Sequence, residues 1–499
     1  MRTFIISALF VVSGILGFCC QMLYANYFGS GKEMDIYFSL LSIPAIITGA
    51  TGTIFSSLFF PAFARLEKSE LDDYIYRIKI HVSRIAFIIA VIGFAITYFY
   101  LNNIIETEDP FYYDLAFILS ILFWFNSYLS IVNGYLASVQ NYFKNFLIVS
   151  STQLLVYFGI IIFVILFHDL LGVRSIAVGM ITATILSLIT NRYYGNIFHK
   201  SKVSVNVDAL RLFISICLIL ISFLPFHAFA SIAYMWAGQL DNAGCVSFLG
   251  YSHSFCGFLS TAASMGIATV SFPDLAKSLS STDDTILHKG YLNFKNQLEV
   301  VIIFASYVAL FVSLFAHPII EILFMRGQFE MKDVDGLSLV LPIYLINGVL
   351  IAMMNLTRNV YYSLNKQRLF AFISAVATLV FLLFSFVLSK SVSYVFIGLV
   401  ETISMGLFVL ISLYFINSYN KIFDLKFILK IVGQLSMLSI VGFFMFVIYE
   451  KMNAFNISKF VSIIICGVFY SLISDLLLST LIKSPVVLAI NKRIASIIK

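Results

Sequence analysis

Charged residues are scarce along the whole chain. Only 11% of the 499 residues are Asp, Glu, Lys or Arg, whereas 61% are hydrophobic. A water-soluble domain carries about 25% charged residues, so this composition excludes an ordinary soluble fold. The mean hydropathy of +0.98 points the same way.

Motifs of catalysis are also lacking. The sequence contains no Walker A loop, no H-E-x-x-H and no G-x-S-x-G, so neither ATP hydrolysis nor metalloprotease chemistry is supported. The longest predicted outer loops, around 103–112 and 325–335, are too short for a glycosyltransferase or polymerase domain. We therefore expect a protein that is not an enzyme and needs no cofactor or metal. Transport would draw on an ion gradient or the membrane potential.

Cysteine is rare and unpaired in sequence. None of the six forms a C-x-x-C pair, and all fall inside apolar segments, so we interpret them as buried small hydrophobes rather than metal ligands or disulfides. The N-terminal apolar run continues to Tyr24 without a small-residue cleavage site. We interpret it as a retained first span rather than a signal peptide.

Long apolar runs, in contrast, recur from end to end. A run of about 20 apolar residues crosses the hydrocarbon of a bilayer as a helix. The sequence therefore predicts an all-α polytopic membrane protein with about fourteen transmembrane helices. The predicted spans are roughly 4–28, 35–62, 82–104, 113–138, 145–167, 171–194, 209–237, 243–272, 297–320, 336–362, 368–389, 393–416, 426–449 and 459–482.

Basic residues are distributed unevenly between the two sides that this topology defines. About 24 of the 31 Lys and Arg residues fall on the side that holds both termini. Cytoplasmic loops carry such an excess, so we expect both termini in the cytoplasm. The net charge of +6 then reflects topology, and no nucleic-acid partner is expected. About seven basic residues lie on the predicted outer side: Lys32, Arg174, Arg326, Lys332, Lys390, Lys451 and Lys459.

A faint internal repeat divides the chain. Phe60-Pro61-Ala-Phe-Ala-Arg65 closes the second predicted span, and Phe272-Pro273-Asp-Leu-Ala-Lys277 closes the eighth, 212 residues later. Six spans per repeat preserve direction, so we predict two parallel six-helix bundles around a central cavity, a recurrent transporter architecture. The predicted domains are 1–204 and 205–420, with two additional helices and a cytoplasmic tail in 421–499.

The stretch Pro318-Ile-Ile-Glu-Ile-Leu-Phe-Met-Arg-Gly-Gln-Phe329 joins two spans. An apolar segment ends at His317-Pro318, and a polar connection through Gly336 precedes the next segment. We predict a hinge just outside the membrane.

Ionisable side chains at membrane depth are functional candidates because they are costly to bury there. Asp35 is either a cavity-facing carboxylate or the N-cap of its helix. His227 and His253 either bind a diphosphate or carry a proton, or they are neutral and hydrogen-bonded between helices. Arg358 either lines the cavity or reaches lipid headgroups. Glu401 is a candidate for a coupling-ion site.

Several motifs, spread in order from residue 16 to about 370, carry a family resemblance. Leu16-Gly17-Phe18, Tyr27-Phe28-Gly29-Ser-Gly31 with Asp35, Ile43-Pro44 and Phe60-Pro61-Ala-Phe-Ala resemble the opening of the MurJ-type lipid II flippases. Leu323-Phe-Met-Arg-Gly-Gln-Phe329 is similar to that family's L-F-x-R-G-x-F signature, and Tyr361-Tyr-Ser-Leu-Asn365 to its aromatic turn.

The resemblance implies the fold of the multidrug/oligosaccharidyl-lipid/polysaccharide (MOP) exporters and a bacterial cytoplasmic-membrane location. It also implies a cavity made largely by the first, second, seventh and eighth spans. In addition to Asp35, His227, His253 and Arg358, we place Gln21, Thr48 and Tyr251 in this substrate cavity.

The sequence departs from the family at the cavity arginines, whose guanidinium groups suit a diphosphate because they bind it bidentately. At the positions of the family's arginines, the resemblance places Gly14, Cys20, Thr48 and Ser254 in this chain. Of the family's charged cavity residues, Asp35 is present. The missing arginines favour a surface-polysaccharide repeat unit as cargo, and the family motifs favour a lipid II-like peptidoglycan precursor.

We predict a flippase that moves an undecaprenyl-diphosphate-linked saccharide across the cytoplasmic membrane by alternating access. Its partners would be that lipid-linked saccharide, membrane lipids, and a coupling ion or the membrane potential. An alternative is a cation-coupled exporter of small amphipathic compounds on the same fold, for which Glu401 or Asp35 would be essential.

Overall fold

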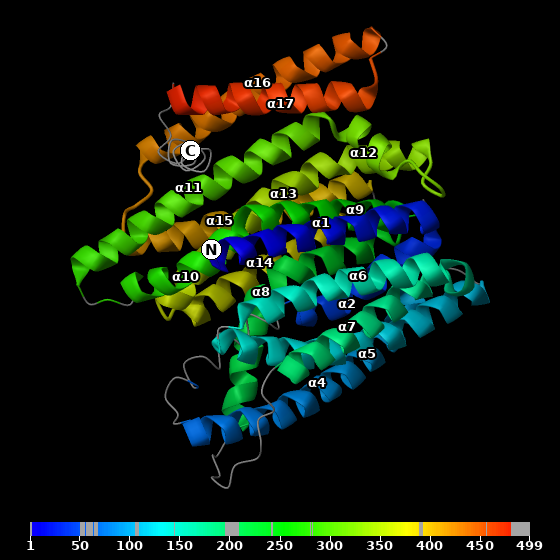
Figure 1. The fold of residues 1–499 in the computed structure, drawn as a ribbon, viewed down its shortest axis with the longest axis vertical. Coiled ribbons are helices and arrows are strands. Elements are labelled where there is room, and N and C mark those ends of the chain that lie inside the picture. The colour runs from blue at the N-terminus through cyan, green and yellow to red at the C-terminus, as the bar shows by residue number, and fades with distance from the viewer. Residues whose placement is uncertain are drawn as a thin grey trace. The chain divides into compact units, whose positions relative to one another are not determined.

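The computed structural model describes residues 2–49, 55, 63, 68–104, 109–143, 145–194, 209–240, 243–279, 281, 283–388, 393–455 and 457–480. The regular structure in these ranges is helical throughout, and no strand occurs in them (Figure 1). The elements are α1 (Arg2–Phe28), α2 (Lys32–Thr48), α4 (Lys68–Ile104), α5 (Pro110–Tyr142), α6 (Phe146–Leu171), α7 (Arg174–Tyr194), α8 (Ala209–Ala237), α9 (Cys245–Ser260), the π-helix η1 (Thr261–Met265), α10 (Gly266–Leu279), α11 (Asp284–Leu314), α12 (Ala316–Phe324), α13 (Met331–Ser363), α14 (Gln367–Leu388), α15 (Tyr394–Tyr419), α16 (Leu425–Ala454) and α17 (Lys459–Thr480).

The all-α polytopic class predicted from the sequence is confirmed. Every predicted span overlaps at least one of these helices. Ten of them, namely α4 to α7, α11 and α13 to α17, are long and apolar enough to cross a membrane. The count of fourteen and the cytoplasmic termini stay predictions.

Local sequence determines where several helices begin. Asp109 caps α5, because its side chain accepts a hydrogen bond from the Phe111 amide at 3.0 Å, and Pro110 supplies a first helical residue that needs no amide donor. Asp283 caps α11 in the same way, with Thr285 donating through both its hydroxyl and its amide. These bonds hold the pKa of Asp283 below its ordinary value.

Two predicted spans are interrupted. The span predicted over 243–272 consists of α9, the five-residue π-helix η1 and α10. The span predicted over 297–320 is replaced by α11, which ends at Leu314, and the short α12. Hydropathy cannot register either break, because the chain stays apolar across both.

The predicted hinge at 318–329 is therefore only partly correct. Residues 318–324 lie within α12, where Pro318 is the third residue and its missing amide proton costs no intrahelical bond. The connection is short, since a capping box between Glu330 and Asp333 starts α13 at Met331. Lys332, Asp333 and Asp335 are helical rather than part of a loop.

The chain forms two compact units. The first comprises residues 1–251, 327–329 and 367–404, and the second comprises 252–326, 330–366 and 405–499. The domains predicted from the repeat stay a prediction, because residue 204 and most of the first Phe-Pro motif lie outside the described residues.

Close helix packing in the first unit depends on small residues. Any side chain at Gly93 on α4 would overlap the indole of Trp124 on α5. A Cβ at Gly17 would lie 3.1 Å from the ring of Tyr157, which brings α1 against α6.

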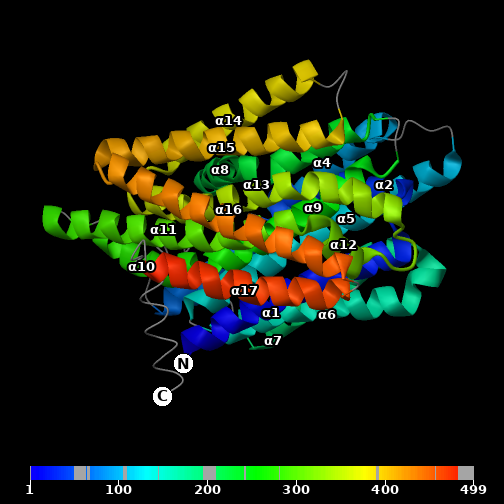
Figure 2. The same cartoon turned by 90° about the horizontal axis from the view of Figure 1, so that it is seen from above.

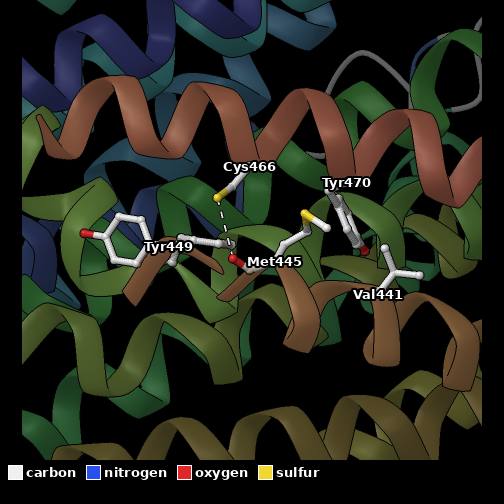
Figure 3. Packing of buried hydrophobic residues seen from close by; sticks show 6 residues of the cluster. Val441, Met445, Tyr449, Cys466 and Tyr470 are labelled. Carbon is white, nitrogen blue, oxygen red and sulfur yellow. Dashed lines mark hydrogen bonds between the residues drawn. The ribbon is translucent and has the colours of Figure 1, made fainter. Parts of the chain in front are cut away.

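In the second unit, α16 and α17 run side by side, with α11 next to α16 (Figures 1 and 2). Figure 3 shows their core, in which Val441, Met445 and Tyr449 of α16 face Cys466 and Tyr470 of α17. The Cys466 thiol donates to the Met445 carbonyl oxygen at 3.5 Å. Apolar packing thus joins the middle of this hairpin.

Ion pairs hold the ends of the same hairpin. Lys430 of α16 lies 2.5 Å from the buried carboxylate of Glu299 on α11. Lys459 at the start of α17 donates to both carboxylate oxygens of Glu321 on α12, at 2.6 and 2.7 Å. The hairpin is therefore attached to its unit at both ends.

Candidate functional site

The signature segment 327–329 contacts the turn between α1 and α2 through main-chain atoms. The Gln328 amide donates to the Asn26 carbonyl oxygen at 3.0 Å. Gly327 has φ +58°, and any Cβ there would overlap that same carbonyl. Glycine is required at this position both for its left-handed backbone and for the close approach.

The opposite side of this contact also requires glycine. Gly29 has φ +65°, and a Cβ there would lie 2.8 Å from the Gln328 carbonyl oxygen. The Tyr251 hydroxyl donates to the Gly29 carbonyl oxygen at 2.7 Å, and its ring packs edge-on against Phe329, with 5.9 Å between ring centroids. We call Asn26, Gly29, Gly327, Gln328 and Tyr251 the backbone clasp.

Tyr251 was predicted to line the substrate cavity, and this stays a prediction. Its side chain is fully buried and its hydroxyl is engaged in the clasp. These contacts hold the turn after α1 in place.

Asp35 lies next to the clasp and binds the N-terminus of α9. One carboxylate oxygen accepts from the Gly244 amide at 2.7 Å. The other accepts from the Ser247 amide at 2.7 Å and its hydroxyl at 2.5 Å. An anion is favoured there because the first amides of a helix have no intrahelical acceptor and the helix dipole is positive at that end.

The interpretation of Asp35 as the cap of its own helix was therefore wrong. Gly31 occupies the N-cap position of α2, and Asp35 caps a helix more than 200 residues further along the chain. A local capping rule cannot identify such a partner, and neither Gly244 nor Ser247 was singled out from the sequence.

His227 lies against Gly49, the residue after Thr48, where α2 packs on α8. The imidazole of His227 lies directly against the backbone at Gly49, so that any side chain there would overlap it. The Thr48 hydroxyl donates to the Pro44 carbonyl oxygen of its own helix at 3.2 Å. The Ser231 hydroxyl, one turn after His227, contacts the Ser42 carbonyl oxygen at 3.0 Å.

Gln21 and Glu401 are the remaining predicted site residues of the first unit. Gln21 on α1 is half-buried, and its Oε1 atom has no hydrogen-bond partner among the residues that the structure describes. Such an atom is free to accept from a bound molecule. Glu401 on α15 is buried, with 1% of its surface exposed.

The remaining two candidates belong to the second unit. His253 on α9 packs edge-on against Tyr344 of α13, with 6.0 Å between ring centroids. Arg358 on α13 is only 6% exposed, so it does not reach lipid headgroups in this structure. Its neighbours Asn355 and Asn359 donate to Ser264 of η1 and to the Ala268 carbonyl of α10, both at 3.0 Å.

The hydrogen bonds of Asn355 and Asn359 hold the face of α13 that carries Arg358 against η1 and α10.

Within the described ranges, no group of three or more His, Cys, Asp or Glu side chains is arranged to hold a metal ion. The candidate residues of the two units instead supply hydrogen-bond donors and acceptors, buried charged groups and aromatic rings. They are suited to binding and conformational change.

Comparison with known proteins identifies the family. A sequence model described as "Lipid II flippase MurJ" matches residues 24–466. The chain belongs to the MurJ lipid II flippase family. It is therefore a transporter and a multi-pass protein of the bacterial inner membrane.

A relative and two solved structures accompany this flippase assignment. "Probable lipid II flippase MurJ" of Borreliella burgdorferi is 22% identical over 396 residues, which are 74% of each chain. The structure "Lipid II flippase MurJ, inward closed conformation" is 19% identical and covers 96% of this chain and 100% of its own, with a TM-score of 0.76. An inward-facing multidrug resistance MATE transporter of the MOP superfamily is 13% identical, with a TM-score of 0.61, and covers 85% of this chain and 96% of its own.

The flippase carries small or uncharged groups at the positions that its motifs pair with the family's cavity arginines. Cys20 is buried, and its thiol points to the Tyr157 carbonyl oxygen at 3.9 Å. Gly14 and Ser254 are half-buried, and the Thr48 hydroxyl is used within α2. Arg358 is the guanidinium among the candidate cavity residues.

Proposed function

We propose that this flippase moves an undecaprenyl-diphosphate-linked saccharide from the inner to the outer leaflet by alternating access. The observation that carries the proposal is the family match over residues 24–466. A polar saccharide cannot cross hydrocarbon unassisted, because each buried polar group without a partner costs several kcal/mol, about 2–7. A polar interior in the protein would replace the lost hydration.

The backbone clasp and Asp35 supply a contact that such a cycle could make and break. Both lie at the predicted outer ends of the helices that they join, and both depend on a few hydrogen bonds rather than on a large apolar interface. We propose that they close the outer side while the cargo headgroup enters from the cytoplasm. Opening the outer side would expose the N-terminus of α9 to water.

For the cargo, we propose that Arg358 of the second unit binds the diphosphate, with His253 of the same unit as a further polar partner. We propose His227, Gln21 and Thr48 as the polar groups that the first unit offers to the cargo. Guanidinium is the cation best matched to a diphosphate, because it donates two parallel hydrogen bonds. Glu401, buried on α15, is the proposed coupling-ion residue.

Complementation would test the cargo. The chain would be expressed in bacteria depleted of their own lipid II flippase, while a periplasmic probe follows outer-leaflet lipid II. We expect rescue of growth and of the probe signal. Asp35→Asn would abolish rescue, whereas Asp114→Asn, an exposed carboxylate on α5, would leave it intact.

A second cargo is favoured by one observation, the absence of arginine at positions 14, 20, 48 and 254. Loss of rescue by a protein that is inserted and abundant would contradict lipid II as the cargo. Lipid-linked repeat units of a surface polysaccharide would then accumulate in a deletion strain of the source organism.

A further inference from the structure

A cavity of about 390 Å³ lies in the second unit, where α11, α12, α13, α16 and α17 meet. Specific small-molecule sites range from about 300 to 1,000 Å³, so it is large enough for a small polar group. The connection between α16 and α17 falls on the predicted outer side, which places the cavity at the outer surface of the membrane. None of the candidate transport residues lines it.

The charges of the lining leave one carboxylate unneutralised. Lys459 donates to both oxygens of Glu321, and the ring of His317 bonds to Asp335 at 3.0 Å. Glu450 also lines the cavity and forms no ion pair with any other described residue. The cavity therefore offers an anionic site for a cation.

A second part of the lining suits a phosphate group. The Lys459 ammonium has three N–H donors, and the two bonds to Glu321 leave one available. Ser313 and Asn453 line the same cavity and add a hydroxyl and an amide. Donors for an anion and an acceptor for a cation are thus present within one small volume.

Apolar surface adjoins the cavity. Phe446 and Leu314 are part of the lining. Phe455, at the end of α16, is 81% exposed, and Phe460, directly after Lys459, is 57% exposed. Phenylalanine side chains are favourable in the hydrocarbon of a membrane, so acyl chains would lie against these two rings.

We propose that this cavity binds the headgroup of a zwitterionic phospholipid of the outer leaflet, with a primary ammonium at Glu450 and the phosphate at Lys459. The ligand chemistry is an alkylammonium separated by a short linker from a phosphodiester. A bound headgroup would bridge α16 to α17 next to the Lys459–Glu321 pair. It would thereby hold the hairpin in place at the outer surface.

Native mass spectrometry of the purified full-length protein would test this proposal, with phosphatidylethanolamine, phosphatidylglycerol and phosphatidylcholine as probes. We expect preferential retention of phosphatidylethanolamine by the wild type. Glu450→Gln would weaken its retention about tenfold or more, as expected for a lost hydrogen bond to a charged group. Glu450→Asp would restore part of it, and Asp114→Asn would retain it fully.

Equal retention of phosphatidylglycerol, or unchanged retention of phosphatidylethanolamine by Glu450→Gln, would overturn the proposal. Displacement of the lipid by soluble ethanolamine at matched concentration would also overturn it, since the ligand would then be a free amine. Retention is measured without transport. Its outcome is therefore independent of the complementation test.

Discussion

At the scale of single residues, the clasp joins Gln328 to Asn26 through main-chain atoms, and the Tyr251 hydroxyl is its side-chain contribution. Gly29 and Gly327 face each other's segments with positive φ angles, and both would meet main-chain atoms if they carried a Cβ. The contact is therefore set by the absence of side chains at two positions 298 residues apart.

Gly327→Ala tests this directly. We expect a loss of about 1–2 kcal/mol from the left-handed backbone alone, and more from the overlap with the Asn26 carbonyl. Thermal unfolding of the purified protein would measure the loss. Gly31→Ala is the matched control, because Gly31 lies in the same turn but has φ −75° and no neighbour within 4 Å of its Cβ position. Equal effects of the two variants would contradict the proposed contact.

Asp35→Asn tests the cap on α9. The amide keeps one acceptor oxygen but turns an NH₂ group toward amide donors, so we expect a loss of about 1.5–3 kcal/mol. Ser247→Ala removes only the hydroxyl and leaves both amide bonds, so its cost should be smaller, about 0.5–1.5 kcal/mol. Differential scanning calorimetry of both variants would check the order. A larger effect of Ser247→Ala would show that the carboxylate is not the principal cap.

At the scale of helices, α16 is attached to α11 by a charged pair whose two members differ in exposure. Glu299 is 3% exposed and receives Lys430 at 2.5 Å. Lys295 and Asp424 form a second pair between the same region and the start of α16, with the aspartate 57% exposed. A buried charge depends on its partner far more than an exposed one does.

Lys430→Met should therefore destabilise the protein by about 3–5 kcal/mol, because Glu299 is left buried without its counter-ion. Adding Glu299→Gln should restore most of the loss, since the buried charge is then gone. Asp424→Asn is the control and should have the smallest effect of the three. Urea or thermal unfolding in detergent would give these values. Failure of the double variant to recover would mean that Lys430 acts through packing.

The hydropathy of the sequence predicted the helices. It predicted neither the breaks within them nor the hydrogen bonds between residues far apart in the chain. Every predicted span overlaps a described helix, since apolar runs of this length have few other solutions in a membrane. The π-helix at 261–265 and the break at Phe315 were missed, because they change hydrogen bonding rather than composition. Asp35 was singled out from the sequence, but its partners on α9 follow from tertiary structure.

At the scale of the whole molecule, orientation in the membrane follows from the distribution of basic residues. About 24 of 31 Lys and Arg residues fall on the side of the termini, and the family assignment places the protein in the inner membrane. The predicted outer side includes the start of α13 and the connection between α16 and α17.

Labelling of intact cells with an impermeant thiol reagent would test the orientation. We expect Lys332→Cys, exposed at the start of α13, to react from outside. Lys289→Cys, exposed near the start of α11, should react only after lysis. The wild type is the blank, because its described cysteines are buried or half-buried. The reverse pattern would place the termini outside.

The main-chain nature of the clasp has a consequence for how this protein can vary. Contacts made by main-chain carbonyl and amide groups do not depend on the flanking side chains. The exposed Arg326 and Gln328 can therefore be replaced by many residues without loss of the hydrogen bond between the Gln328 amide and the Asn26 carbonyl. The tolerance should fall abruptly at Gly29 and Gly327, where even a methyl group is too large. A library saturated at positions 29 and 326–328 would therefore be permissive at 326 and 328 and intolerant at the two glycines. Such a profile would locate the clasp in homologues of unknown structure.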